Sequence, residues 1–119
     1  MNKITLPVLF TIILAVAGIR SAWAENPESN YRLYCAQCHG LKGNGAGINK
    51  ADMSATPRDH TNRAEMPKLK DKDLYLAIEQ GGVAVGKSAL MPAWNGVLTD
   101  TEIKEIVAYL RKLCNCSEE

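Results

Sequence analysis

The sequence predicts an all-α domain with three main helices joined by long loops. Three segments combine a helix-start signal or a helix-stop signal with apolar residues at helical spacing. No pair of segments shows the alternating pattern of paired strands, and no internal repeat or low-complexity tract is present. The loops between the helices are longer than a compact domain normally tolerates, so something in the interior must organise them.

The first 24 residues have the pattern of an export signal. A positive start with Lys3 is followed by an apolar run over residues 4–19, and Ala22 and Ala24 fit the small-x-small cleavage pattern. The run is shorter than the roughly 20 residues that span a bilayer. We expect cleavage after Ala24, which gives a signal peptide at 1–24 and one domain at 25–119. An N-terminal membrane anchor that stays uncleaved is the alternative.

The composition excludes some function classes. The chain has 119 residues, 46% of them hydrophobic, and a formal net charge of +1, which argues against nucleic acid or an anionic membrane surface as partner. Without residues 1–24 the charge becomes −1, and the aromatic residues are Tyr31, Tyr34, Tyr75, Trp94 and Tyr109. A domain this small, with so few aromatic side chains, can hardly build a core from side chains alone. We therefore expect a non-protein group in its interior.

The first helix is predicted to begin at Asn26, which can cap it, with Pro27 in the first turn and Glu28 near its positive end. One face of this helix carries tyrosines and cysteines: Tyr31, Tyr34, Cys35 and Cys38. The glycine-rich residues 40–47 that follow indicate a series of turns. They lack the GK[ST] ending of a phosphate-binding loop, and no strand precedes them.

The middle of the chain predicts one short helix. Residues 50–70 show no sustained period, and Asp71 can then cap a helix over 72–80 that Gly81 and Gly82 end. Residues 83–98 are predicted to be loop.

The last helix has the clearest start signal in the chain. Thr99 and Glu102 fit a capping box, and Leu98 can pack on Ile103 as a hydrophobic staple. Its apolar residues recur at helical spacing: Ile103, Ile106, Val107, Leu110 and Leu113.

The segment Cys35–His39 reads CAQCH, a C-x-x-C-H run that is the attachment site of a covalent c-type haem. Both thiols bond to vinyl-derived carbons of the haem, and the adjacent imidazole reaches the iron from the same short segment. A thioredoxin-like pair would need a βαβ pattern, and a zinc site would need a second ligand pair with suitable spacing. We therefore predict one covalent haem c bound by Cys35, Cys38 and His39, with His39 as an iron ligand.

A second axial ligand is expected among the methionines and the other histidine. Met91 fits best, because it lies in an irregular loop between the second and last helices and Pro92 restrains it to an extended conformation. Met66, which also precedes a proline, is the main alternative. Met53, His60 and an open coordination position remain further possibilities, although loop packing or exposure is the simpler role for these residues.

With these motifs the chain resembles a class I c-type cytochrome, a small exported electron carrier with one haem. The resemblance covers nearly the whole domain, from CAQCH through LMPAW to AYL in the last helix. It implies the cytochrome c fold, in which three main helices and long loops wrap the haem and the first and last helices cross. The crossing would bring Tyr31 against Ile106 and Tyr109.

The resemblance also implies roles for two loop residues. The carbonyl of Pro57 would accept the Nδ1–H of His39. Trp94 would lie near a haem propionate, although simple aromatic packing explains it equally well. Cys114 and Cys116 are outside the family pattern, and free thiols, a bridge to another chain and a local disulfide all remain open, with a two-residue spacing unfavourable for the last.

The function expected from the resemblance is one-electron transfer in the periplasm, outside the bacterial cytoplasmic membrane. With His39 and Met91 both bound, the iron would take no small-molecule substrate, so no enzyme activity is expected. Redox proteins would dock transiently over the haem edge, and the membrane would be a partner only if the signal stays uncleaved. The alternatives are a haem subunit of a specific oxidoreductase, a haem peroxidase or gas sensor if Met91 dissociates, and a thiol redox protein without haem.

Overall fold

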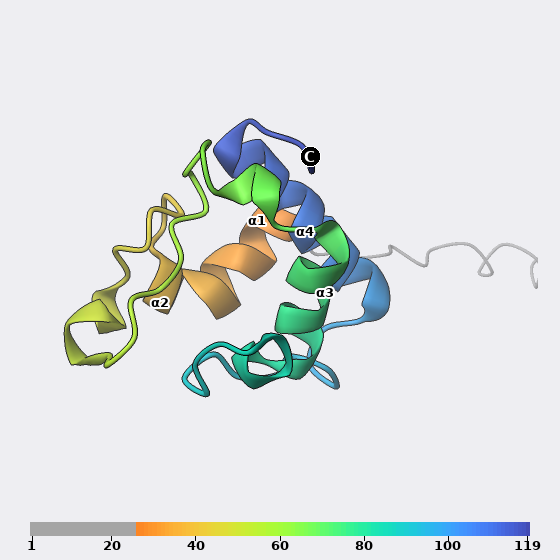
Figure 1. Ribbon diagram of the computed structural model, residues 1–119. Coiled ribbons are helices and arrows are strands. Elements are labelled where there is room, and N and C mark those ends of the chain that lie inside the picture. Colours follow the sequence, from red (N-terminus) through yellow and green to blue (C-terminus); the bar gives the residue numbers. More distant parts are fainter. Residues whose placement is uncertain (1–25) are drawn as a thin grey trace, which may run out of the picture.

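A computed structural model describes residues 26–119, and all of their regular elements are helical (Figure 1). The predicted all-α class is therefore confirmed. The proposed signal peptide at 1–24 lies outside the described residues. Within residues 26–119, no helix combines the length and the apolar character needed to cross a bilayer.

The N-terminal helical segment runs from α1 (Pro27–Asn30) through a π-helical turn, η1 (Tyr31–Cys35), into α2 (Ala36–His39). It begins as predicted, because the Asn26 side chain accepts a hydrogen bond from the Glu28 backbone N–H at 3.0 Å. The π-helical turn was not predicted. Such turns occur frequently at functional sites, and this one ends at Cys35, the first cysteine of CAQCH.

Between the terminal helical segments lie three 3-10 turns and one longer helix. The turns are η2 (Ile48–Asp52), η3 (Met66–Lys68) and η4 (Gly82–Val85), and the helix is α3 (Asp71–Gln80). Gly81 ends α3 at a φ of +85°, a conformation that glycine adopts without strain. The predicted cap was wrong: Lys70 holds the N-cap position, and Asp71 is the first helical residue.

The last helix, α4 (Asp100–Cys114), begins with the predicted capping box. The Thr99 hydroxyl accepts from the Glu102 N–H at 3.3 Å, and the Glu102 carboxylate accepts from the Thr99 N–H at 2.8 Å. Leu98 and Ile103 are both buried in the core next to this cap, as a hydrophobic staple requires. The start of α4 thus has the local interactions that the sequence predicted.

We expect Thr99→Ala to lower the free energy of unfolding by about 1 kcal/mol, because it leaves the Glu102 N–H without its acceptor. Chemical denaturation of the haem-loaded protein measures this loss. Thr101→Ala is the matched control, since Thr101 is exposed in the same first turn but is not the cap residue. Equal losses in both variants would show that the cap contributes nothing specific.

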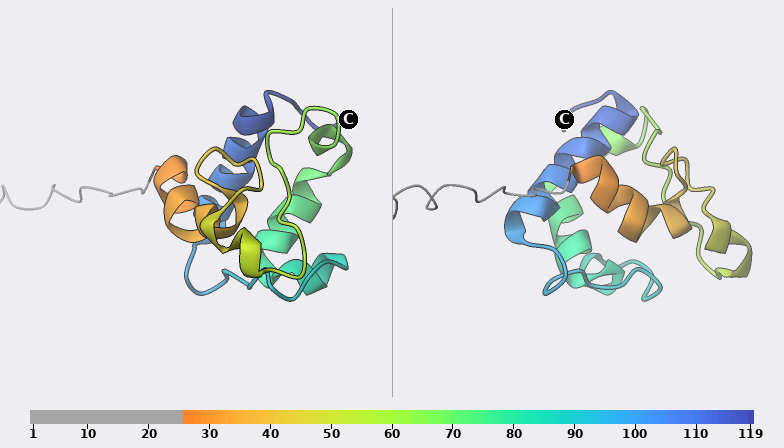
Figure 2. Two further views of the ribbon diagram at one scale, coloured as in Figure 1. Left: turned by 90° about the vertical axis from the view of Figure 1, so that its left-hand side faces the viewer. Right: turned by 180° about the vertical axis from the view of Figure 1, so that it is seen from behind.

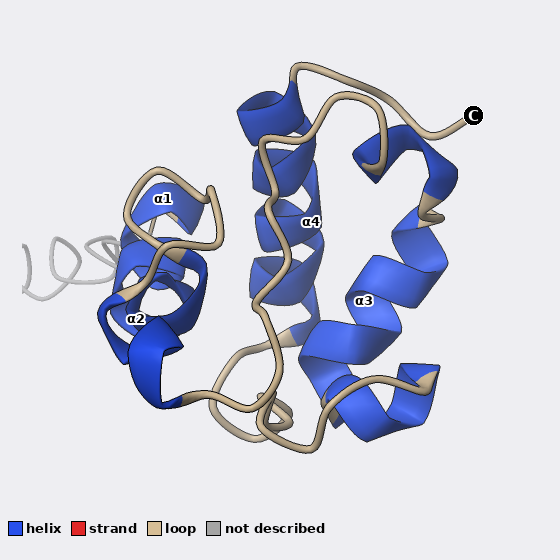
Figure 3. Cartoon of the chain, turned by 60° about the vertical axis from the view of Figure 1, so that its left-hand side comes forward, coloured by secondary structure: helices blue, strands red, loops and turns tan. Residues whose placement is uncertain are grey.

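The core forms around α4, which contacts both α1 and α3 and stands between them (Figure 3). Tyr31 and Ile106 are fully buried, and the rings of Tyr31 and Tyr109 lie 5.3 Å apart between centroids. The predicted crossing of the first and last helices is therefore confirmed. Figure 2 shows the same arrangement from two further directions, with the segment before α3 passing alongside α4.

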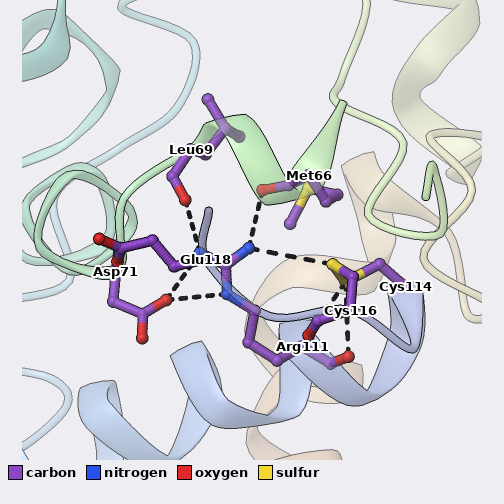
Figure 4. A network of polar contacts seen from close by, with 7 residues as sticks. All are labelled: Met66, Leu69, Asp71, Arg111, Cys114, Cys116 and Glu118. Atoms are coloured by element: carbon purple, nitrogen blue, oxygen red, sulfur yellow. Dashed lines mark hydrogen bonds and ion pairs between the residues drawn. A yellow bond between two sulfur atoms is a disulfide. The ribbon is translucent and has the colours of Figure 1, made fainter. Parts of the chain in front are cut away.

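The C-terminal end of α4 is linked to the segment that precedes α3 (Figure 4). The Arg111 guanidinium donates to the carbonyls of Met66 and Leu69 at 2.7 and 2.5 Å and to the Asp71 carboxylate at 2.8 Å. The Asp71 carboxylate is thus bonded to Arg111 of α4 rather than to the backbone of its own helix.

Cys114 and Cys116 form a local disulfide, one of the three possibilities that the sequence left open. Their Cα atoms are 5.2 Å apart, which is within the usual range for a disulfide. The expectation that the two-residue spacing would be unfavourable was therefore wrong. Asn115 removes the difficulty, because its left-handed conformation, with a φ of +47°, ends α4 between the two cysteines.

Candidate functional site

A cavity of about 800 Å³ lies between the helices and the long loops. Such a volume falls within the range of roughly 300–1,000 Å³ that is typical of ligand and cofactor sites. Its walls include apolar side chains of α3 and α4, namely Leu74, Ile78, Ile106 and Leu110. The side chains of this domain thus leave a large part of its interior unfilled, as its small size and few aromatic residues predicted.

The CAQCH segment forms part of the cavity wall, with Cys35, Cys38 and His39 all lining it. Both cysteines are free thiols. Burial and the neighbouring Cys38 raise the pKa of the Cys35 thiol to about 12. Because catalytic redox cysteines need a lowered pKa, this environment argues against a thioredoxin-like pair.

The imidazole of His39 is held by one backbone hydrogen bond, in which its Nδ1 donates to the Arg58 carbonyl at 2.9 Å. The carbonyl of Pro57 was predicted to accept this bond, and the prediction was wrong by one residue. Pro57 directs its carbonyl at Gly45 instead, where even a Cβ atom would come within 2.7 Å of that oxygen. Since Nδ1 carries the proton, Nε2 keeps its lone pair for a metal, and burial lowers the pKa of His39 and so favours this neutral form.

The glycine-rich loop at 40–47 folds back over the end of α2. The N–H groups of Gly45 and Gly47 donate to the carbonyls of His39 and Cys38 at 2.7 and 3.1 Å. A Cβ atom at Gly47 would come within 2.2 Å of the Gln37 carbonyl, so this approach requires glycine. The loop therefore caps the C-terminus of α2, which agrees with its prediction as a series of turns.

Met91 is half-buried and lines the same cavity from the loop between η4 and α4. Its carbonyl accepts from the Gly82 N–H at 3.0 Å. A side chain at Gly82 would clash with the Ser88 carbonyl, which would lie 2.2 Å from the added Cβ. The glycine after α3 therefore lets this loop pack closely enough to bring Met91 to the cavity.

The other candidates for a second axial ligand lie in different places. Met66 is fully buried in the core and is not among the residues that line the cavity, although Met53 is. His60 lines the cavity but stacks on His39, with ring centroids 4.2 Å apart and planes 20° apart. A ring stacked on His39 cannot coordinate a metal on the side opposite His39. Met91 therefore remains the predicted ligand, with Met53 as the alternative.

Trp94 also lines the cavity, and its ring centroid lies 5.1 Å from that of Tyr34. The aromatic packing proposed for Trp94 is thus present in the structure.

A buried polar pair beside His39 was missed by the sequence analysis. The Tyr31 hydroxyl and the His60 Nδ1 are 2.8 Å apart, and both side chains are buried. The two residues are 29 positions apart and His60 lies in an irregular segment, so no spacing rule links them. The available signal was the Tyr31 hydroxyl on a helix face expected to be buried, because a buried hydroxyl usually finds a partner.

The residues at the cavity fit the group that CAQCH predicts. Two thiols, one neutral imidazole and one thioether line a single cavity with largely apolar walls. Histidine and methionine are the axial ligand pair of c-type cytochromes. A planar apolar cofactor attached at Cys35 and Cys38 would fill the space that the side chains leave.

Comparisons with known proteins identify a family for the chain. Residues 22–110 match the family described as cytochrome C oxidase, cbb3-type, subunit III. No curated protein has a significantly similar sequence.

Two solved structures are similar to the chain. One is a chain of the Kuenenia stuttgartiensis reducing HAO-like protein complex Kustc0457/Kustc0458, with 26% identity and a TM-score of 0.60. The match covers 75% of this chain but only 41% of that one, so the chain spans less than half of that relative. The other is the KustC0563 c-type cytochrome, with 23% identity, a TM-score of 0.60 and coverage of 74% and 96%, a similarity of fold.

The family match extends over three quarters of the sequence and includes the CAQCH wall of the cavity. Its members carry a covalently bound c-type haem and act in haem-based electron transfer. The chain is a c-type cytochrome domain and belongs to the family of the cbb3-type cytochrome c oxidase subunit III.

Proposed function

We propose that this chain is a one-electron carrier with a single haem c, attached through Cys35 and Cys38 and ligated by His39 and Met91. The observation that carries the proposal is the cavity itself, because segments far apart in the sequence bring these four side chains to one enclosure. A bound c-type haem would supply an iron centre that alternates between Fe(III) and Fe(II).

The residues around the cavity would set how easily that centre is reduced. The Arg58 carbonyl fixes the His39 tautomer and leaves Nε2 as the ligand atom. A Met91 thioether ligand would favour Fe(II), and so would contact of the haem with the apolar walls from α3 and α4. If His39 and Met91 both ligated the iron, no coordination position would be left for a substrate.

The proposed setting is the periplasm, with transient redox protein partners. The support for export is the signal pattern at residues 1–24. Electron-transfer complexes usually bury small interfaces, which suits brief encounters.

A second candidate function is that of a haem subunit in a larger oxidoreductase. The matched family is described as an oxidase subunit, and one similar structure is part of a redox protein complex. The two candidates differ in whether the chain works as a free carrier. Size-exclusion chromatography of the native source extract with haem detection separates them, since a subunit elutes with a larger assembly.

Haem staining after denaturing electrophoresis tests the proposed function directly. We expect the full chain, produced in a bacterium that matures c-type cytochromes, to keep its haem under denaturation because the bonds from Cys35 and Cys38 are covalent. Redox titration should then follow a one-electron Nernst curve. A version without residues 1–24 stays in the cytoplasm and should lack covalent haem. A denatured full chain without stain would refute the proposal.

A further inference from the structure

We propose that His60, held by Tyr31, is a positioning residue that fixes the orientation of the His39 imidazole plane. This inference rests on the proposed function, in which His39 ligates the haem iron. It assigns a role to the buried tyrosine–histidine pair, which neither attaches the haem nor ligates it.

The hydrogen bond from His39 to Arg58 leaves one motion of the ring free. A single Nδ1–H···O bond tolerates deviations of about 30° from linearity, so the ring can still turn to that extent about its Cβ–Cγ bond. The face of His60 lies almost parallel to that plane, at a centroid distance of 4.2 Å and an angle of 20°. Rotation of His39 would drive its ring edge into His60. The stacked ring therefore restrains the motion that the hydrogen bond permits.

His60 can act in this way only because it is itself fixed. Only 7% of its surface is exposed, and its backbone N–H donates to the Gly43 carbonyl at 2.6 Å. Its Nδ1 lies 2.8 Å from the Tyr31 hydroxyl, in edge-on contact with the tyrosine ring. Tyr31 thus holds the imidazole, and the bond to Gly43 holds the backbone that carries it.

Tyr31 connects this arrangement to the helical core. Its side chain is fully buried, and its ring packs against Tyr109 of α4 at 5.3 Å. A continuous series of contacts therefore runs from α4 through Tyr31 and His60 to His39. The orientation of the proposed iron ligand is set by the crossing of the terminal helices as well as by the local loop.

Four substitutions separate the contributions of ring and hydrogen bond. His60→Ala removes the stacked ring, and His60→Phe keeps a ring but removes Nδ1. Tyr31→Phe removes only the hydroxyl that bonds His60. Tyr109→Phe is the matched control, because it removes a tyrosine hydroxyl from the other neighbour of Tyr31, which is not bonded to His60.

The readouts are the electron paramagnetic resonance g values and the haem-methyl proton shifts of the oxidised holoprotein, together with its midpoint potential. The g values and methyl shifts depend on the orientation of the axial ligand plane. We expect His60→Ala to change the g values and the spread of methyl shifts and to move the potential. His60→Phe should restore most of the wild-type pattern, Tyr31→Phe should change it partly, and Tyr109→Phe should leave it unchanged.

Wild-type spectra and potential in His60→Ala, with haem bound, would overturn the proposal. If His60→Ala does not fold, the two tyrosine variants decide: a change in Tyr31→Phe alone supports the proposal, and wild-type values in both overturn it. Failure of the proposed function would give a different result. The wild-type protein would then carry no covalent haem, and neither it nor any variant would give haem signals.

Discussion

A Cys35→Ser/Cys38→Ser variant is expected to lose covalent haem completely and to fold poorly. Serine hydroxyls do not form the thioether bonds, so the haem is no longer tied to the chain. Without the haem, the apolar side chains that line the cavity lose the contacts that would cover them, and a typical domain is stabilised by only about 5–15 kcal/mol. The loss of attachment should therefore appear both as missing stain and as reduced helix content.

The measurement is haem staining after denaturing electrophoresis, paired with far-ultraviolet circular dichroism. Cys114→Ser/Cys116→Ser is the matched control, because it removes two cysteines by the same chemical change but none that line the cavity. The control should keep its covalent haem and lose only the disulfide, whose three-residue loop is worth roughly 1–2 kcal/mol by chain entropy. Normal staining in the first variant would contradict the assigned attachment site.

The second large effect is expected from Met91→Ala. Removing the thioether leaves one axial position without a protein ligand, so the iron should become high-spin or take up water. The potential should fall, because the thioether favours Fe(II). Added azide or carbon monoxide should now bind, which is the behaviour of the peroxidase and sensor alternatives. Optical spectra in both oxidation states and a redox titration measure these changes.

Met66→Ala and Met53→Ala identify which methionine is the ligand. Met66 is fully buried in the core, so its truncation should cost about 2–5 kcal/mol of stability and leave the spectrum unchanged. Met53→Ala should change neither the stability nor the spectrum by much. A wild-type spectrum in Met91→Ala, combined with a high-spin spectrum in Met53→Ala, would transfer the ligand role to Met53.

The helices could be predicted wherever their signals are local. The Thr99 capping box, the Asn26 cap and the glycine stop after α3 each involve residues within a few positions of one another. The Asp71 cap was wrong, because Asp71 is already the first helical residue and its carboxylate bonds to Arg111, 40 residues further along. Helix boundaries that depend on such distant partners cannot be deduced from local patterns.

The candidate site likewise contains residues that a local motif predicts and residues whose partners are distant in the sequence. CAQCH is a contiguous motif whose spacing follows from the cofactor chemistry, so its cysteines and histidine could be named at once. The partner of His39 was missed by one residue, because loop 57–60 has no periodicity that sets which carbonyl points inward. The stacking of His60 depends on three segments that meet only in the folded chain, so the sequence carried no signal for it.

The disulfide at the end of α4 has a consequence for the chemistry of haem attachment. Four cysteines can form two disulfides in three ways, and two of these would link the CAQCH cysteines to the C-terminus. Pairing Cys114 with Cys116 leaves Cys35 and Cys38 as the free thiols at the cavity. If haem is attached as proposed, the local disulfide would act as a protecting group: it would keep the sulfurs of Cys114 and Cys116 from reacting, so that attachment could use only Cys35 and Cys38.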